Sequence, residues 1–112
     1  KMNYNEQPEF SKKFRKLAKK YRSLPEDLKE FKKVVDVNPL GTGKHFNIIT
    51  KNEKAVILKS RFFSRYLKGS TLRMIYSYRK DLGLIEFLEI YFKGEKENAN
   101  YQMIKNYLKL LE

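Results

Sequence analysis

The chain of 112 residues has no cysteine and no tryptophan, and it has only one histidine and three prolines. Without thiols it can form neither a disulfide framework nor a thiolate metal site, and one histidine among dispersed acids leaves no credible metal centre. No apolar run approaches the roughly 18 residues that a membrane span requires, and the first residues lack the apolar core of a secretory signal. We therefore expect a cytoplasmic protein that needs no metal, small-molecule cofactor or membrane.

Lysine and arginine are abundant, with 25 of them against 13 acidic residues and a net charge of +12. The excess is local, because residues 51–80 carry nine cations and a single acid, Glu53. Aromatic residues are interleaved with these cations: Phe62, Phe63, Tyr66, Tyr76 and Tyr78. Cations flanked by aromatic rings are typical of proteins that bind a phosphate backbone and stack on bases. A merely solubilising surface would scatter both signs of charge, so we favour nucleic acid as the ligand.

The first third of the chain has the apolar spacing of two helices. Apolar residues recur on one helical face from Phe10 to Tyr21, with lysines and arginines elsewhere around that helix. A second face follows Pro25 and would bury Leu28, Phe31, Val34 and Val35. Ser23 is expected to cap this second helix, with Glu26 returning a bond to the Ser23 amide. A hairpin of two helices is therefore predicted, and its first helix is very basic.

The rest of the chain changes to the alternating period of strands. Residues 55–66 predict a strand with Lys59, Arg61 and Arg65 on one face, and residues 72–78 predict its neighbour. Residues 84–92 are nearly all apolar, as in a central strand, and residues 2–6 are a further short candidate. Helical spacing returns from Tyr101 to Leu111. The sequence predicts a single α+β domain over residues 1–112, with an N-terminal helical hairpin, an antiparallel sheet of three to four strands and a C-terminal helix.

Four stretches carry a resemblance to a known family: Phe10-x3-Phe14-x2-Leu17, Leu24–Leu28, Leu72–Tyr76 and Ile90–Asn98. Together they resemble the RelE/ParE superfamily of bacterial toxins over nearly the whole chain. The most specific part is a strand with Arg73-x-x-Tyr76 that leads through a turn to an apolar strand ending in Tyr91-Phe92-Lys93. The resemblance implies a toxin that a cognate antitoxin neutralises. RelE-like members cleave mRNA in the ribosomal A site and ParE-like members poison DNA gyrase, and the resemblance does not choose between them.

The resemblance also implies roles for particular residues. Arg73 matches the strand arginine that such nucleases place against the scissile phosphate. Lys68 falls near a basic position of the preceding strand, and Lys93 lies where the family has a basic residue or a histidine at the end of the last strand. Tyr101 matches a tyrosine that stacks on a base in some members. Because no histidine ends the last strand here, the branch that uses one is in doubt.

The residues themselves limit the chemistry of RNA cleavage without a metal. A guanidinium stays protonated and offers two donors to phosphate oxygens, so Arg73, Arg61 or Arg65 suits binding and charge stabilisation rather than proton removal. A lysine crowded by cations would have its pKa lowered, which makes Lys59, Lys68 or Lys93 the candidate base. His45 is interpreted as an ordinary polar residue in a loop or at a strand start. Phe63 and Tyr66 are the aromatic residues expected to be exposed.

From the sequence we predict a toxin that acts as a ribosome-dependent, metal-independent mRNA endoribonuclease. Its partners would be a cognate antitoxin, mRNA and the ribosome, and an acidic or amphipathic antitoxin segment would cover the cations and offset their repulsion. Three alternatives stay open: a ParE-like gyrase inhibitor, an inactive RNA-binding member, and cations that contact only antitoxin or solvent. The predicted catalytic residues are Arg73, Lys68, Lys93 and Arg61, and the predicted nucleic-acid contacts are Lys59, Arg65, Phe63, Tyr66 and Tyr101.

Overall fold

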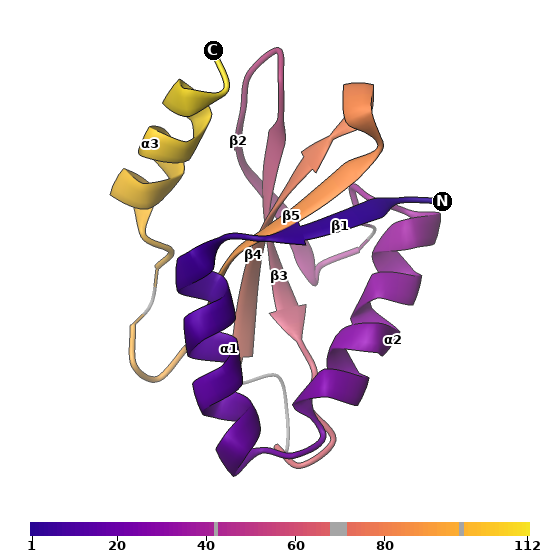
Figure 1. The fold of residues 1–112 in the computed structure, drawn as a ribbon, viewed down its shortest axis with the longest axis vertical. Helices are drawn as coiled ribbons and strands as arrows, with labels where there is room; N and C mark the ends of the chain where they lie inside the picture. The colour runs from indigo at the N-terminus through magenta and orange to yellow at the C-terminus, as the bar shows by residue number, and fades with distance from the viewer. Residues whose placement is uncertain (42, 68–71, 97) are drawn as a thin grey trace.

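The computed structural model describes residues 1–41, 43–67, 72–96 and 98–112 (Figure 1). Three helices and five strands follow one another in a βααββββα order, and a short 3-10 turn at Lys80–Leu82 joins the last two strands. The elements are β1 (Asn3–Glu6), α1 (Pro8–Lys20), α2 (Leu24–Val37), β2 (Phe46–Lys51), β3 (Val56–Phe62), β4 (Leu72–Arg79), β5 (Leu84–Phe92) and α3 (Tyr101–Leu110).

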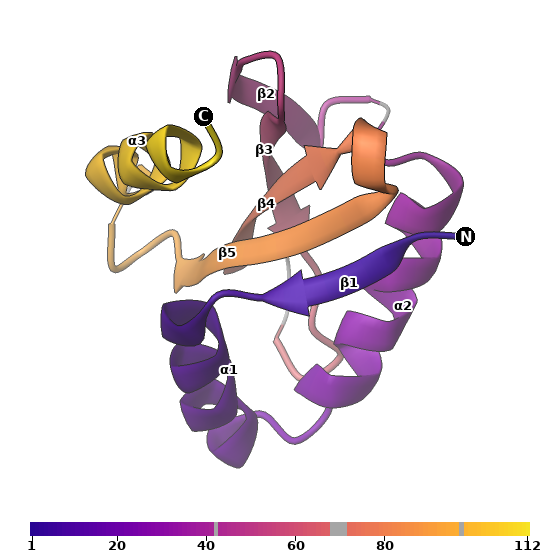
Figure 2. The ribbon, with the colours of Figure 1, turned by 45° about the horizontal axis from the view of Figure 1, so that its top comes forward.

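The five strands form one sheet in the order β1-β5-β4-β3-β2 (Figure 2). The α+β class and the short first strand are confirmed. The sheet itself differs from the prediction of three to four antiparallel strands, because it has five strands and β1 runs parallel to β5. The strand missing from the prediction is β2, an edge strand that buries none of its residues and exposes 54% of Ile48. An edge strand of this kind lacks the apolar alternation by which a strand is recognised.

Two apolar cores lie on opposite faces of the sheet. Helices α1 and α2 cover one face and splay apart from the turn that joins them (Figures 1 and 2). Helix α3 packs on part of the other face, over Ile57, Ile75 and Leu88. Phe10, Leu28, Phe31 and other predicted core residues of α1 and α2 are buried, but Val34 is not, since 52% of it is exposed. The part of the second face that α3 leaves uncovered is where polar residues collect.

The segment after β3 departs from the predicted strand. β3 ends at Phe62, so Arg65 and Tyr66 lie in the following loop and not on the strand face of Lys59. The reason is a buried polar cluster in which Asp27 accepts bonds from the Ser23 hydroxyl at 2.7 Å and from the Arg65 amide at 3.2 Å. Ser23 thus bonds to Asp27 and makes no side-chain cap to the helix, contrary to the predicted capping box. The cluster ties the start of α2 to the loop.

A β-bulge in β5 changes which face two glutamates occupy. Ile75 pairs with Glu89 but Tyr76 pairs with Phe87, so Leu88 has no partner across the ladder. Simple alternation would put Glu86 and Glu89 on opposite faces, whereas the bulge brings both to the α3 side. Gly83 lies in the turn between β4 and β5, directly after Leu82. It takes φ +56°, a left-handed conformation that glycine adopts without strain.

Candidate nucleic-acid interface

A row of polar and aromatic residues crosses the open part of the sheet. The Arg61 amide donates to the His45 carbonyl at 3.1 Å, which extends the β2–β3 ladder by one residue. Arg61 is directly opposite Arg73 on β4, and Arg73 is directly opposite Tyr91 on β5. Residues directly opposite one another in a sheet share a face. His45, Arg61, Arg73 and Tyr91, here called the basic row, therefore come from four consecutive positions across the sheet.

A pocket of about 170 Å³ opens on this row. Eight of the residues that the structure describes line it, of which five are lysines or arginines and none is acidic. These eight are Lys44, His45, Asn47, Lys59, Ser60, Arg61, Arg73 and Lys93. Lys59 belongs to the neighbouring row, where it lies between Asn47 and Ile75. The pocket, called the basic pocket below, therefore gathers cations from two strands and two loops around one small volume.

Two positively charged residues of the basic row, Arg61 and Arg73, lie directly opposite each other on neighbouring strands. Arg73 is only 9% exposed and its guanidinium donates to the Leu72 carbonyl at 3.2 Å. Burial lowers the pKa of Arg73, the charge of Arg61 lowers it further, and Tyr91 acts in the opposite direction. Arginine nevertheless keeps its proton in proteins, and like charges directly opposite in a sheet are destabilising. An anion in the basic pocket would relieve this repulsion, and a phosphate has the oxygens that a guanidinium binds in pairs.

His45 is the residue of this site that sequence reasoning missed. It lines the basic pocket, and its Nδ1 is buried without a hydrogen-bond partner among the described residues. Its ring meets Phe63 edge to face at 5.5 Å. The sequence predicted His45 in a loop or at a strand start, and it lies in the turn directly before β2, but its place in the pocket was not predicted. His45 lies beside Arg61 because β2 pairs with β3. A prediction that included β2 would therefore have placed His45 in the site.

Comparison with known proteins gives the fold a precedent. Neither a protein-family model nor a curated protein sequence matches this chain. Among solved structures, the chain is similar to one in the archaeal RelE–RelB complex from Pyrococcus horikoshii OT3, with a TM-score of 0.63 and 16% identity over 85% of this chain and 98% of that chain. The chain has a RelE-like fold. The resemblance found in the sequence is therefore confirmed for the fold.

The RelE-like fold brings some of the predicted site residues together and separates others. Arg61, Arg73, Lys59 and Lys93 all line the basic pocket. The remaining predicted residues do not line it, and they are distributed over the loop after β3 and the start of α3: Phe63, Arg65, Tyr66 and Tyr101. Lys68 lies outside the described residues.

The two aromatic residues after β3 are exposed, as predicted. Phe63 exposes 55% of its surface and touches His45, so it lies next to the basic pocket. Tyr66 is 64% exposed. Tyr101 is the first residue of α3 and is also about half exposed, but its described relation to the site is only electrostatic, since it acts on the pKa of Tyr91. Phe63 is therefore the aromatic residue best placed to stack on a base beside the pocket.

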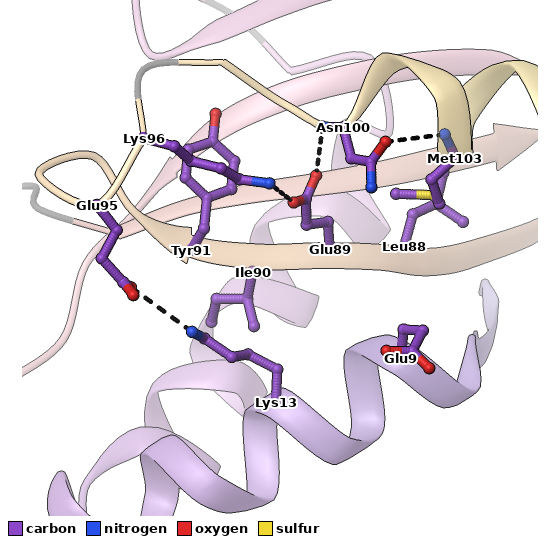
Figure 3. Close-up of a pocket in the computed structure, with 10 residues that line it drawn as sticks. All are labelled: Glu9, Lys13, Leu88, Glu89, Ile90, Tyr91, Glu95, Lys96, Asn100 and Met103. Atoms are coloured by element: carbon purple, nitrogen blue, oxygen red, sulfur yellow. Dashed lines mark hydrogen bonds and ion pairs between the residues drawn. The ribbon is translucent and has the colours of Figure 1, made fainter.

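A second hollow, of about 320 Å³, lies beyond Tyr91 where β5 meets α1 and α3 (Figure 3). Glu89 accepts from the Lys96 ammonium and, at 2.9 Å, from the Asn100 amide, and Asn100 in turn caps α3. Lys13 of α1 pairs with Glu95 at 3.5 Å. Lys96 also lies 5.0 Å from the centre of the Tyr91 ring. Glu89 and Glu95, two acids of the described residues near the basic row, are thus engaged in holding the connection between β5 and α3.

The described ranges contain no group of three or more histidine, cysteine, aspartate or glutamate residues arranged to hold a metal ion. No helix in those ranges has the length and apolar character needed to cross a membrane.

Proposed function

We propose that this protein is a RelE-like toxin that cleaves mRNA on the ribosome, acts in the cytoplasm and is inhibited by a cognate antitoxin. The observation that carries the proposal is a pocket in which the described lining has five lysines or arginines, Arg61 and Arg73 among them, and no acidic residue. Guanidinium groups bind the oxygens of a phosphate in pairs, so this lining suits a phosphate of RNA. The fold, shared with a protein solved as a RelE–RelB complex, agrees with this reading.

In the proposed reaction the ribose 2′-oxygen attacks the phosphorus and the 5′-oxygen leaves, so that a 2′,3′-cyclic phosphate forms. Arg73 and Arg61 bind the non-bridging oxygens and stabilise the negative charge that develops in the transition state. Arg73 is fixed by burial and by its bond to the Leu72 carbonyl, which preorganises it for this role. Neither arginine transfers a proton.

Proton transfer then falls to the other groups of the pocket. Histidine is the side chain suited to gain and lose a proton near neutral pH, and His45 lines the pocket beside Arg61. We assign His45 to the 2′-hydroxyl proton. Lys59 or Lys93, which line the same pocket, supplies a proton to the leaving 5′-oxygen. Lys59 and Lys93 therefore keep a catalytic role, but the proton acceptor becomes the histidine.

The surroundings of the pocket suit a single strand of RNA. Phe63 offers an exposed ring on which a flanking base can stack, and base–aromatic stacking tolerates any sequence. The ribosome would hold the messenger in register. An acidic antitoxin segment would occupy the same cations and so exclude RNA.

The proposal is tested by inducing the protein in cells and mapping mRNA 5′ ends for the wild type and for Arg73→Ala. Loss of one preorganised donor to the transition state is expected to lower cleavage by about a hundredfold or more. Arg79→Ala is the matched control, because Arg79 is on the same strand but pairs with Asp81 at the far end. This variant should cleave normally.

Three results would contradict the proposal. Arg73→Ala could cleave as the wild type does, which would remove the basic row from the chemistry. Intact transcripts together with blocked supercoiling would indicate a gyrase inhibitor. Binding of RNA without any new 5′ ends would indicate an inactive RNA-binding member of the same fold.

A further inference from the structure

Helix α1 presents a second concentration of positive charge that the basic pocket does not use. Its apolar side chains Phe10, Phe14 and Leu17 are buried against the sheet. The rest of the helix and the turn after it expose six cations, here called the α1 surface: Lys12, Arg15, Lys16, Lys19, Lys20 and Arg22. Three of these, Arg15, Lys19 and Arg22, surround the small side chain of Ala18 and line an open hollow with it.

These cations are not balanced by acids. None of the six forms an ion pair within the part of the chain that the structure describes; in α1 only Lys13 does so. Several of them are three or four positions apart, as Lys12 and Lys16 are, and like charges at this spacing destabilise a helix. The arrangement therefore opposes helix stability rather than supporting it.

Helix α2 is an internal control for this comparison. It packs on the same face of the same sheet, yet its exposed lysines alternate with acids. Lys29 pairs with Glu26 at 3.2 Å, and Lys33 pairs with Glu30 at 3.0 Å. Mixed charge is thus enough to keep a helix of this layer in solvent. The uniform charge of α1 needs another explanation, and a polyanionic ligand supplies one.

The chemistry of the α1 surface limits the kind of polyanion. A membrane-binding helix inserts its apolar face, but the apolar face of α1 is already in the core. Single-stranded nucleic acid is held by exposed aromatic rings as well as by cations. The aromatic residues of α1 are buried, and Tyr21 after it packs edge to face on Phe92. Cations without stacking partners match double-helical RNA, which proteins recognise through its backbone and shape.

We propose that the α1 surface binds the phosphate backbone of a double-helical RNA segment, separate from the strand that enters the basic pocket. The two sites are on opposite faces of the sheet, since α1 packs on one face and the basic row lies on the other. One RNA strand cannot fill both sites without passing around the molecule. If the proposed function holds, folded ribosomal RNA is the duplex that the α1 surface contacts while the pocket takes the messenger.

The experiment measures binding of a fluorescent RNA hairpin with a stem of about 16 base pairs, at several salt concentrations. The test variant is the triple Lys12→Gln, Lys16→Gln and Lys19→Gln. The control is the triple Lys29→Gln, Lys33→Gln and Lys109→Gln, which removes the same charge from exposed positions on α2 and α3. Circular dichroism checks that both variants are folded. Vesicles of anionic phospholipid serve as a second probe.

We expect the α1 triple to bind the hairpin more than tenfold more weakly at low salt. Its plot of log affinity against log salt should lose about two to three units of slope, as when about three phosphate contacts are removed. The control triple should keep the wild-type slope. The inference would be overturned by equal losses in both triples, by no loss in the α1 triple, or by binding to vesicles alone.

Because this assay measures binding and not cleavage, it separates the two proposals. An α1 triple that loses the hairpin, beside an Arg73→Ala variant that still cleaves, would leave the α1 surface standing and remove the proposed catalytic site.

Discussion

The face of the sheet that carries α3 has two halves on the same strands, and they differ in how their buried polar groups are hydrogen-bonded. Under α3, the buried carboxylate of Glu86 has neutral partners, whereas Arg79 Nε at the end of β4 is buried without a hydrogen-bond partner among the described residues. Glu86 is 6% exposed and accepts from the Asn5 and Gln7 amides and from the Tyr107 hydroxyl, which also bonds to Ser77. Apolar residues of β3, β4 and β5 fill the space around them. The Glu86 carboxylate is therefore fully hydrogen-bonded within this core.

The other half, a few residues along the same strands, contains the basic row and leaves more of its buried polar groups without partners among the described residues. Arg61 and Arg73 face each other, and His45 Nδ1 and the Tyr91 hydroxyl are buried without partners among the described residues. Buried polar groups are usually bonded, and the exceptions call for an explanation. Since the same sheet satisfies its carboxylate completely at one end, the fold is able to provide partners. The difference suggests that the basic row is completed by a ligand.

Replacing His45 with Ala should produce the largest change in activity. Loss of a general acid–base group lowers a rate by about a hundred- to ten-thousand-fold. The imidazole has an unpartnered buried nitrogen, so thermal stability should change little. Cleavage of a ribosome-bound message, measured beside a melting curve, checks both halves of this expectation. Wild-type cleavage in the variant would show that proton transfer does not involve this side chain.

Replacing Glu86 with Leu should have the opposite effect to the His45 variant: it should lower stability and leave cleavage unchanged. The change leaves the buried Tyr107 hydroxyl and the more exposed Asn5 and Gln7 amides without their acceptor, and an unsatisfied buried donor costs about 1–3 kcal/mol. We expect a loss on the order of 3 kcal/mol in the free energy of unfolding, measured in denaturant, with cleavage retained by the folded protein. A variant that is as stable as the wild type would show that the hydrogen bonds of Glu86 do not stabilise this half of the sheet.

A smaller effect is expected at alkaline pH, from tyrosines in the two cores. Burial raises the pKa of Tyr4 to about 12, with Asp36 adding to the shift, and burial also raises the pKa of Tyr76 and of Tyr107. A folded-state pKa above the unfolded value, about 10 for tyrosine, gives stability that is complete below pH 10 and is lost as pH rises through the folded pKa.

We therefore expect the free energy of unfolding to fall from about pH 10 upward, with Tyr4 ionising near pH 12. Tyrosinate absorbance followed together with circular dichroism tests this. Tyr107→Phe removes one of the contributing groups and should make the alkaline loss shallower. If all tyrosines ionise near pH 10 while the protein stays folded, the packing assigned to them is wrong.

Much of the fold follows from the sequence because its signals are local. The apolar stripe of Phe10, Phe14 and Leu17 and the near-continuous apolar run of β5 specify elements through burial alone. What could not be predicted depends on pairing between distant segments. The parallel contact of β1 with β5, the edge strand β2 and the bulge at Leu88 leave little trace in local periodicity.

The candidate site shows the same division. Lys59, Arg61 and Arg73 were found because alternation places cations of adjacent strands on one face, and they do line one pocket. Arg65 was misplaced because the Asp27 carboxylate binds its amide and ends the strand early. His45 was undervalued because its neighbours come from a strand pairing that only the structure reveals.

The central claim is that Arg61 and Arg73 line one pocket in order to bind a phosphate. Stability and cleavage measured together for Arg61→Gln test it most directly. We predict that the free energy of unfolding changes by no more than about 1 kcal/mol and that mRNA cleavage falls sharply. Undiminished cleavage by the folded variant would contradict the account.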